Sequence, residues 1–299
     1  MKIIDGKFYS EQILSELRAE VAGLIDNDLR APHIAAVLVG SDGASETYIA
    51  NKEKKARSIG MTSSLYRLPV DVSERELLDV ISFLNNDSEV DGILVQLPLP
   101  AHISSTRVIE AISPLKDVDG FHPINMGRLA LGQDGFVPAT PLGVMELLQR
   151  ASIDTEGKHC VILGRSNIVG TPMALLMSRN NKYANSTVTL CHSKTANLAA
   201  IASTADILIV AIGKPEFVTA SMVREGAVVI DVGIHRLPSN GGDYRIVGDV
   251  KYNEVAARAS AITPVPGGVG VMTTTCLLQN VMKAYRLQLA ITENARINK

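Results

Sequence analysis

Short, uninterrupted runs of aliphatic and β-branched residues recur along this chain and constrain its fold more than any other feature. Continuous apolar runs suit strands that are covered on both faces, as in parallel sheets. Segments with a helical period separate the runs, as in residues 10–26, where the apolar positions fall on one stripe. The alternation predicts an α/β fold with doubly wound parallel sheets. The predicted strands are residues 34–39, 92–97, 160–163, 187–190, 207–212 and 227–232.

The length of 299 residues suggests two domains, at about 150 residues per domain. Residues 121–136 are rich in Gly and Pro and show little periodicity, which places the domain change there or just beyond. We expect one α/β domain over residues 1–139 and a Rossmann-type domain over residues 140–272. The last periodic segment, residues 273–299, follows a Gly- and Pro-rich turn, so we expect it to leave the second domain and complete the first.

Local signals mark the ends of several predicted helices. Ser73 opens a capping-box pattern at the start of one helix. Thr140 and Thr171 each precede a proline, which predicts an N-cap followed by proline at the first helical position. A helix that includes Ser45 is expected to end at Gly60.

Composition excludes several classes of protein. The net charge of −2 gives no overall electrostatic attraction to nucleic acid or to an anionic membrane. The apolar runs are far shorter than the ~20 residues of a membrane helix, and Asp5 interrupts the N-terminus before a signal peptide can form. The three cysteines are widely spaced and the histidines lack metal-ligand spacing, so we expect a cytoplasmic protein with no metal.

A glycine turn follows the strand predicted at residues 160–163. The turn begins at Gly164 and reaches Gly170, where a helix is predicted, and this arrangement presents backbone N–H groups to a pyrophosphate. The spacing departs from the usual dinucleotide fingerprint because Ser166 replaces the second glycine and the last glycine comes one place late. A dinucleotide site is favoured, and a simple strand-to-helix connection is the alternative.

The end of the next strand bears on the choice of dinucleotide. An NAD site usually has an acidic residue there for the ribose hydroxyl, but residues 190–195 contain none. Arg165, Ser193 and Lys194 can instead receive a 2′-phosphate, so NADP is favoured over NAD. An ordinary solvated strand end is the alternative.

Three polar features in the first half are candidates for chemistry. Tyr48 and Lys52 are four residues apart on a predicted helix and so share one face. Gln96 ends a strand, where open α/β sheets place ligands. Asp117 and Asp119 lie in a loop. Each feature also has an ordinary structural interpretation: a basic helix face is usually only solvated, and the loop with the two carboxylates can be a turn without a functional role.

Taken together, these strings resemble the bifunctional methylenetetrahydrofolate dehydrogenase/methenyltetrahydrofolate cyclohydrolase family. The resemblance covers nearly the whole chain and implies two α/β domains that flank a cleft, an NADP cofactor and a homodimer. Its motifs are VQLPLP (95–100), KDVDGFHP (116–123), GRSNIVGTP (164–172), CHSKT (191–195) and PVPGGVG (264–270).

The resemblance assigns roles to the candidates in the first half. Lys52 matches the catalytic lysine of the family, Tyr48 the tyrosine that stacks on folate, and Gln96 the glutamine that interacts with the lysine. Asp119 matches the carboxylate that binds the pterin. A lysine whose pKa is lowered can move protons, and a carboxylate matches the donors of a pterin ring.

The resemblance also assigns residues in the second half. The loop of Gly267, Gly268 and Val269 resembles the one that lines the folate pocket. Ile234 matches a backbone contact near the nicotinamide. The candidate cofactor-binding residues are Gly164, Arg165, Ser166, Gly170, Ser193 and Ile234.

The chain departs from the family pattern at two positions. Val271 stands where the family usually has proline, beside the folate loop, so the rigidity of that loop is open. Ala139 replaces a frequent cysteine, which we interpret as a packing difference.

The implied function is oxidation of 5,10-methylenetetrahydrofolate by NADP⁺, followed by hydrolysis of the methenyl product to 10-formyltetrahydrofolate. The alternative within the family is a dehydrogenase without the hydrolase activity, and an alternative from another class is a non-catalytic NADP-binding sensor. A shikimate-type NADP dehydrogenase, which also uses a Lys and an Asp, is a further alternative, against which the VQLPLP and KDVDGFHP strings speak.

Overall fold

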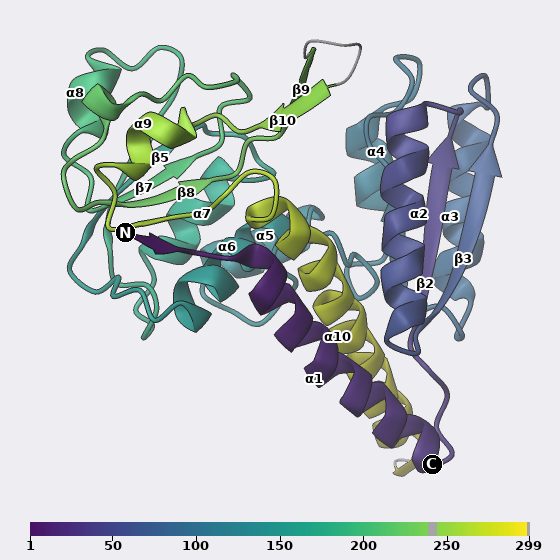
Figure 1. The fold of residues 1–299 in the computed structure, drawn as a ribbon. Helices are drawn as coiled ribbons and strands as arrows, with labels where there is room; N and C mark the ends of the chain where they lie inside the picture. Colours follow the sequence, from purple (N-terminus) through teal and green to yellow (C-terminus); the bar gives the residue numbers. More distant parts are fainter. Residues whose placement is uncertain (239–243, 298–299) are drawn as a thin grey trace. The chain divides into compact units, whose positions relative to one another are not determined.

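The computed structural model describes residues 1–238 and 244–297, which form two compact units (Figure 1). The six-stranded unit comprises Met1–Glu11 and Thr140–Thr273, and the three-stranded unit comprises Gln12–Ala139 and Thr274–Lys299. The grouping of residues 1–11 with the second half of the chain is a feature that the sequence analysis did not anticipate.

The six-stranded unit contains one all-parallel sheet in the order β1-β11-β8-β7-β5-β6 and an antiparallel pair, β9 and β10. The strands are β1 (Lys2–Ile3), β5 (His159–Leu163), β6 (Thr187–Cys191), β7 (Ile207–Val210), β8 (Val228–Asp231), β9 (His235–Pro238), β10 (Tyr244–Val247) and β11 (Ala261–Ile262). The helices are α6 (Ala139–Arg150), α7 (Gly170–Met177), α8 (Leu198–Ala202), the 3₁₀ turn η1 (Ala220–Met222) and α9 (Tyr252–Ala256).

The four strands predicted in this half are present, and the α/β fold class is confirmed. The apolar side chains of β5 and β7 are buried because helices cover the sheet, whereas Leu190 in the edge strand β6 is 37% exposed. Val161, Leu208 and Val229 contact residues of α8, η1 and α9, including Val255. On the strand order, β5 and β7 are the neighbours at which the chain reverses its direction across the sheet, which defines the topological switch point.

Two predicted N-caps are wrong. Helix α6 already includes Ala139, and α7 begins at Gly170 with Val169 in the capping position, so Thr140 and Thr171 lie inside their helices. The hydroxyl of Thr140 bonds instead with that of Thr273, 3.0 Å away. At α7, the first turn starts early because the preceding loop folds back onto it, as described below.

The three-stranded unit contains a parallel sheet in the order β3-β2-β4. The strands are β2 (His33–Val39), β3 (Thr62–Leu68) and β4 (Gly92–Val95). The helices are α1 (Gly6–Asp26), α2 (Gly43–Ser58), α3 (Glu74–Asn86), α4 (Ser105–Ala111), α5 (Pro123–Ala130) and α10 (Val269–Ile297), of which α1 and α10 also contribute residues to the six-stranded unit.

Helix α3 shows how local sequence fixes an element here. The capping box at Ser73 is confirmed: its hydroxyl accepts from Glu76 N, and the Glu76 carboxylate accepts from Ser73 N. Leu77, Ile81 and Leu84 recur at helical spacing and are fully buried. Replacing one such side chain by alanine typically costs about 2–5 kcal/mol.

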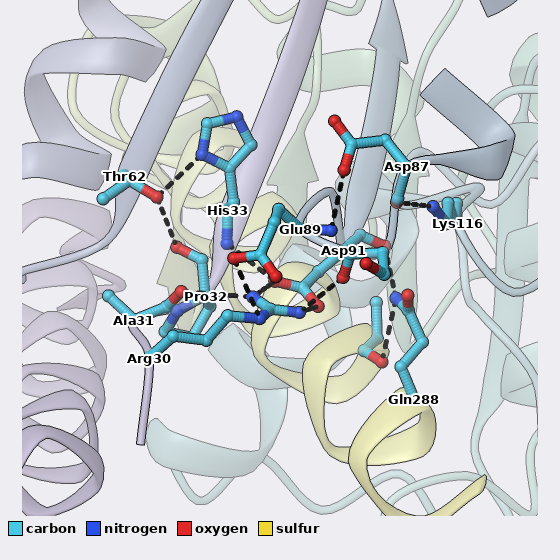
Figure 2. A network of polar contacts seen from close by, with 12 residues as sticks. Arg30, Ala31, Pro32, His33, Thr62, Asp87, Glu89, Asp91, Lys116 and Gln288 are labelled. Atoms are coloured by element: carbon cyan, nitrogen blue, oxygen red, sulfur yellow. Dashed lines mark hydrogen bonds and ion pairs between the residues drawn. The ribbon is translucent and has the colours of Figure 1, made fainter. Parts of the chain in front are cut away.

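An ion pair between the partly exposed Arg30 and the buried Asp91 holds the amino ends of β2 and β4 (Figure 2). Arg30 donates two bonds to the fully buried Asp91 carboxylate, at 2.7 and 2.8 Å, and His33 N donates a third at 2.8 Å. Gln288 of α10 donates to the backbone oxygen of Asp91. The C-terminal helix is therefore an integral part of this unit, and Arg286 Nε also bonds with the carboxylate of Glu20 in α1, 2.7 Å away.

Within the described ranges, no helix combines the length and the apolar character that a membrane crossing requires.

Candidate functional site

Helix α2 presents the first two candidate residues. It begins after Asp42, whose carboxylate accepts from Ser45 N at 3.0 Å, and it ends at Ser58 before Gly60, which has a φ of +87°. Tyr48 lies on α2 and is half exposed, and Lys52 lies one turn later, partly buried. The aromatic ring of Tyr48 is thus accessible to a planar ligand beside the Lys52 amine.

Gln96 follows β4 and meets Lys52. Lys52 Nζ donates a hydrogen bond to Gln96 Oε1 at 3.1 Å, while Gln96 Nε2 donates to Leu97 O at 2.8 Å. The second bond fixes the amide orientation and directs its oxygen at the amine. The Gln96 backbone N–H bonds to Val37 O, so the position of the side chain is set by the sheet.

Two charged side chains of the loop at 116–122 are buried and hydrogen-bonded within the three-stranded unit. The buried Lys116 amine donates to Leu84 O and Asp87 O, which lie at the end of α3. The buried Asp117 carboxylate accepts from His122 N at 2.8 Å and from Asn125 Nδ2 at 2.8 Å. These two charges therefore shape the loop.

Asp119 and Lys52 influence each other's protonation. Burial raises the pKa of Asp119 to about 6, an effect that the Lys52 charge opposes and the Asp117 charge reinforces. Burial likewise lowers the pKa of Lys52, and the Asp119 charge partly offsets this. Both groups are thus shifted toward the pH range in which enzymes move protons.

Asn280 of α10 supports this loop and was missed by the sequence analysis. Its Nδ2 donates to Val118 O at 2.8 Å and to Val137 O at 2.9 Å. Gly120, two residues after Val118, has a φ of +74°, and a Cβ there would come within 2.7 Å of Pro138 N. The available signal was an amide in the apolar stretch of the last helix.

A cavity of about 380 Å³ opens at the carboxyl ends of β5, β6 and β7 in the six-stranded unit. This is the topological switch point, where α/β sheets bind ligands. Its lining residues include Gly164, Arg165, Ser166, Ser193, Ile212 and Lys214.

The turn after β5 is built for close backbone approach. Gly164 has a φ of +113°, and a Cβ there would lie 2.1 Å from Ala211 O. A Cβ at Gly170 would lie 1.9 Å from Gly164 O, so the turn folds tightly on the first residue of α7. Ser166 Oγ accepts from Val169 N at 3.1 Å, so the turn is also tied by a side-chain hydrogen bond just before α7 begins. A dinucleotide pyrophosphate fits such a turn.

The two candidates for a 2′-phosphate are available to a ligand. Arg165 and Ser193 are exposed and line the same cavity. Among the described residues, the Arg165 guanidinium has no carboxylate partner. His192 orders the second loop: its backbone N–H donates to Thr195 Oγ1 at 2.8 Å and its Nδ1 accepts from Lys194 N.

The remaining predicted residues also lie in the six-stranded unit. Ile234 follows β8 and is half exposed. Gly267 has a φ of +105° and accepts from Lys7 N, and a Cβ at Gly268 would lie 2.5 Å from Pro264 O. Val269, buried, begins α10. The role of this loop toward a folate bound at Lys52 stays a prediction.

The two departures from the family pattern have structural correlates. Val271 N donates to Gly268 O at 3.3 Å, a bond that proline cannot make. Valine therefore ties the loop by a hydrogen bond where a ring would restrict it. Ala139 is buried at the start of α6, which agrees with a packing role.

The six-stranded unit has a glycine turn at its switch point. The three-stranded unit has a lysine held by a glutamine and a carboxyl whose pKa is raised. These features define a dinucleotide-dependent enzyme of two α/β units. Two family models match the chain: the catalytic domain of tetrahydrofolate dehydrogenase/cyclohydrolase over residues 4–119 and its NAD(P)-binding domain over residues 138–289. The chain belongs to the tetrahydrofolate dehydrogenase/cyclohydrolase family. This confirms the resemblance and excludes the shikimate-type alternative.

Relatives of known sequence and structure support the same family assignment. A protein named bifunctional protein FolD from Cytophaga hutchinsonii is 52% identical over 96% of this chain and 100% of its own length. The crystal structure of the bifunctional enzyme from Campylobacter jejuni superposes with a TM-score of 0.91 at 46% identity, covering 96% of this chain and 99% of that one. A Trypanosoma brucei FolD complexed with NADP and an inhibitor superposes with a TM-score of 0.90 at 36% identity, covering 96% and 98%.

Proposed function

We propose that this protein oxidises 5,10-methylenetetrahydrofolate with NADP⁺ and then hydrolyses the 5,10-methenyl product to 10-formyltetrahydrofolate. Bound NADP⁺ supplies the hydride acceptor for the first reaction. The observation that supports the full, bifunctional activity is the hydrogen bond from Lys52 to Gln96 beside Asp119. A non-catalytic sensor or a dehydrogenase without hydrolase activity has no use for an amine with a lowered pKa at this point.

The two reactions ask different things of these residues. Hydride leaves a carbon flanked by two nitrogens, so the substrate delocalises the cation itself and the protein mainly orients it. Hydrolysis needs more, because water loses a proton as it attacks and a ring nitrogen gains one before the C–N bond breaks. Lys52, with its lowered pKa, takes the first proton and returns the second.

The neighbours of Lys52 bind and orient. Gln96 holds the amine through a neutral oxygen, which directs it without fixing its charge. Tyr48 offers an exposed ring on which a pterin stacks. Asp119, once ionised, accepts two parallel hydrogen bonds from the amino group and the ring N–H of the pterin.

The cofactor residues select NADP⁺ by charge. Gly164 and Gly170 allow the pyrophosphate to approach the backbone at the start of α7. Arg165 and Ser193 receive the 2′-phosphate that NAD⁺ lacks. Ile234 contacts the nicotinamide end through its backbone.

The assembly and the compartment are part of the same proposal. The family resemblance supports a homodimer that acts on a small-molecule folate and binds neither nucleic acid nor membrane. A cytoplasmic location is supported by the three free cysteines, because disulfides are rare in a reducing compartment.

The test is incubation of the protein with NADP⁺ and methylenetetrahydrofolate while NADPH, methenyl- and formyl-tetrahydrofolate are followed separately. Formation of NADPH together with formyl product supports the proposal. NADPH with methenyl product that decays only at the uncatalysed rate identifies a dehydrogenase alone, and no NADPH identifies a sensor.

A further inference from the structure

The Asp249 carboxylate is fully buried in the six-stranded unit and connects two loops. None of the roles proposed above accounts for this connection. Its Oδ2 accepts from Ile212 N at 2.7 Å and from Gly213 N at 3.0 Å. Its Oδ1 lies 2.7 Å from His235 Nε2. A carboxylate oxygen can only accept, so we assign a proton to His235 Nε2, which donates it to Asp249 Oδ1.

These partners lie at the carboxyl ends of neighbouring strands. Ile212 follows β7 and lines the cavity at the switch point. His235 begins β9, directly after Ile234, in the segment that follows β8. A single carboxylate therefore ties the loop after β7 to the loop after β8, at the end of the sheet where the cavity opens.

A second carboxylate fixes the first. Asp231, at the end of β8, accepts from Asp249 N and Gly233 N through Oδ1 and from Val250 N through Oδ2, each at 2.9 to 3.0 Å. Asp231 is also buried. The backbone of Asp249 is thereby held in place, so its side chain reaches both loops in one geometry.

The glycines beside these carboxylates leave no room for a side chain. A Cβ at Gly233 would lie 2.4 Å from Asp249 Cγ, and a Cβ at Gly248 would lie 1.8 Å from Asp231 Oδ2. Glycine is therefore required at positions 233 and 248 for the two carboxylates to occupy these places. Two buried acids are costly to keep unless they are bonded, and here backbone N–H groups and one imidazole bond them.

We propose that Asp249, clamped through His235, is a positioning residue for the nicotinamide half of the dinucleotide. The adenosine side lies toward β5 and β6, which Arg165 and Ser193 follow, so a dinucleotide that crosses the switch point extends its other half toward β7 and β8. The loops after those strands, which the clamp joins, then border the nicotinamide and its ribose. This inference rests on the proposed function and adds a specific role for His235.

The test compares His235→Leu with His235→Gln. Leucine removes the donor, whereas the side-chain amide of glutamine places a donor nitrogen near the position of Nε2. We expect His235→Leu to raise the KM for NADP⁺ or lower dehydrogenase kcat so that kcat/KM falls about tenfold, the loss that corresponds to one hydrogen bond to a charged group. His235→Gln is expected to retain most of the activity.

Two further readouts separate positioning from a general structural effect. The nicotinamide half is common to NAD⁺ and NADP⁺, so His235→Leu is expected to reduce the use of both by the same factor. Hydrolysis of methenyltetrahydrofolate, assayed without dinucleotide, is expected to stay unchanged. Calorimetric titration with NADP⁺ is run in parallel, because it reports dinucleotide affinity even if the wild-type protein shows no turnover and the proposed function fails.

The inference is overturned if His235→Leu matches the wild type in both dinucleotide affinity and dehydrogenase kcat/KM. It is equally overturned if hydrolase and dehydrogenase activities fall together, since that result identifies a contribution to folding alone. Asp249→Asn provides the second variant, and a stable protein with unimpaired hydride transfer from that change contradicts the inference directly.

Discussion

Lys52 donates its hydrogen bond to the amide oxygen of Gln96 at 3.1 Å, and the amide nitrogen of Gln96 is committed to Leu97 O. The lysine therefore has a neutral acceptor in a partly buried place, where burial lowers its pKa and the Asp119 charge only partly opposes this. A carboxylate at position 96 would hold the proton on the amine. The neutral amide at position 96 leaves the Lys52 amine able to lose its proton.

Gln96→Glu tests this relationship. The added charge raises the pKa of Lys52, so the unprotonated amine becomes available only at higher pH. We expect the alkaline rise of hydrolase activity to shift upward by about one pH unit or more, with activity at neutral pH falling about tenfold. Gln96→Met, the uncharged control, is expected to lower activity without moving the pH profile. An unmoved profile in the Gln96→Glu protein contradicts the account.

Arg165→Ala tests cofactor choice. Loss of a charge-assisted contact with the 2′-phosphate costs about 1.5–3 kcal/mol, which is roughly ten- to more than a hundredfold in kcat/KM for NADP⁺. Use of NAD⁺ is expected to change little, because NAD⁺ lacks that phosphate. Steady-state kinetics with both dinucleotides check this. Equal losses with NAD⁺ and NADP⁺ identify Arg165 as structural.

Asp119→Asn tests the buried carboxyl through the pH dependence of stability. The folded pKa of Asp119 is raised to about 6 from an ordinary 3.8, so between these values the folded state binds the proton more tightly. Stability from this group is therefore greatest at low pH and is lost as the pH rises toward and through 6. Relative to wild type, the asparagine variant is expected to gain about 1 kcal/mol of stability between pH 5 and pH 7.5.

Urea unfolding at the two pH values measures this difference. The matched comparison is the folate KM, which is expected to rise in the variant because asparagine cannot accept both pterin donors. In the wild type the same KM is expected to rise below pH 6, as Asp119 becomes protonated. A pH-independent stability difference between the two proteins contradicts the assignment.

The sequence predicted the fold best where neighbouring residues alone determine the local structure. The buried strands β5 and β7 are nearly continuous aliphatic runs, and the capping box at Ser73 is set by two neighbouring residues. Strand β3 was missed because it is partly exposed and mixes Thr, Ser and Arg with its apolar residues. Its pairing with β2 over seven positions overrides that weak pattern.

The limits at the site have a similar cause. Sequence separation hides that Asn280 holds the loop of Asp119, because the bond spans 162 positions to Val118. The sequence pattern alone also did not show that the two carboxylates have different roles. Asp117 bonds to backbone and amide groups, whereas the charge of Asp119 interacts with that of Lys52. The caps at Thr140 and Thr171 failed for the same reason, since tertiary contacts set where those helices begin.

The most direct measurement follows the methenyl intermediate in Lys52→Met. Methionine keeps most of the length and apolar character of lysine but removes the amine. Loss of a general acid–base group typically costs about 10²–10⁴-fold, so hydrolysis is expected to nearly vanish while hydride transfer falls less. Lys54→Met, an exposed position on the same helix, serves as the control and is expected to behave as wild type.

NADPH formation and the absorbance of methenyltetrahydrofolate are recorded together during turnover. The account predicts that the Lys52→Met protein still forms NADPH while the methenyl species accumulates and decays at the uncatalysed rate. A Lys52→Met protein that hydrolyses methenyltetrahydrofolate well above that rate contradicts the role of Lys52 as the proton carrier.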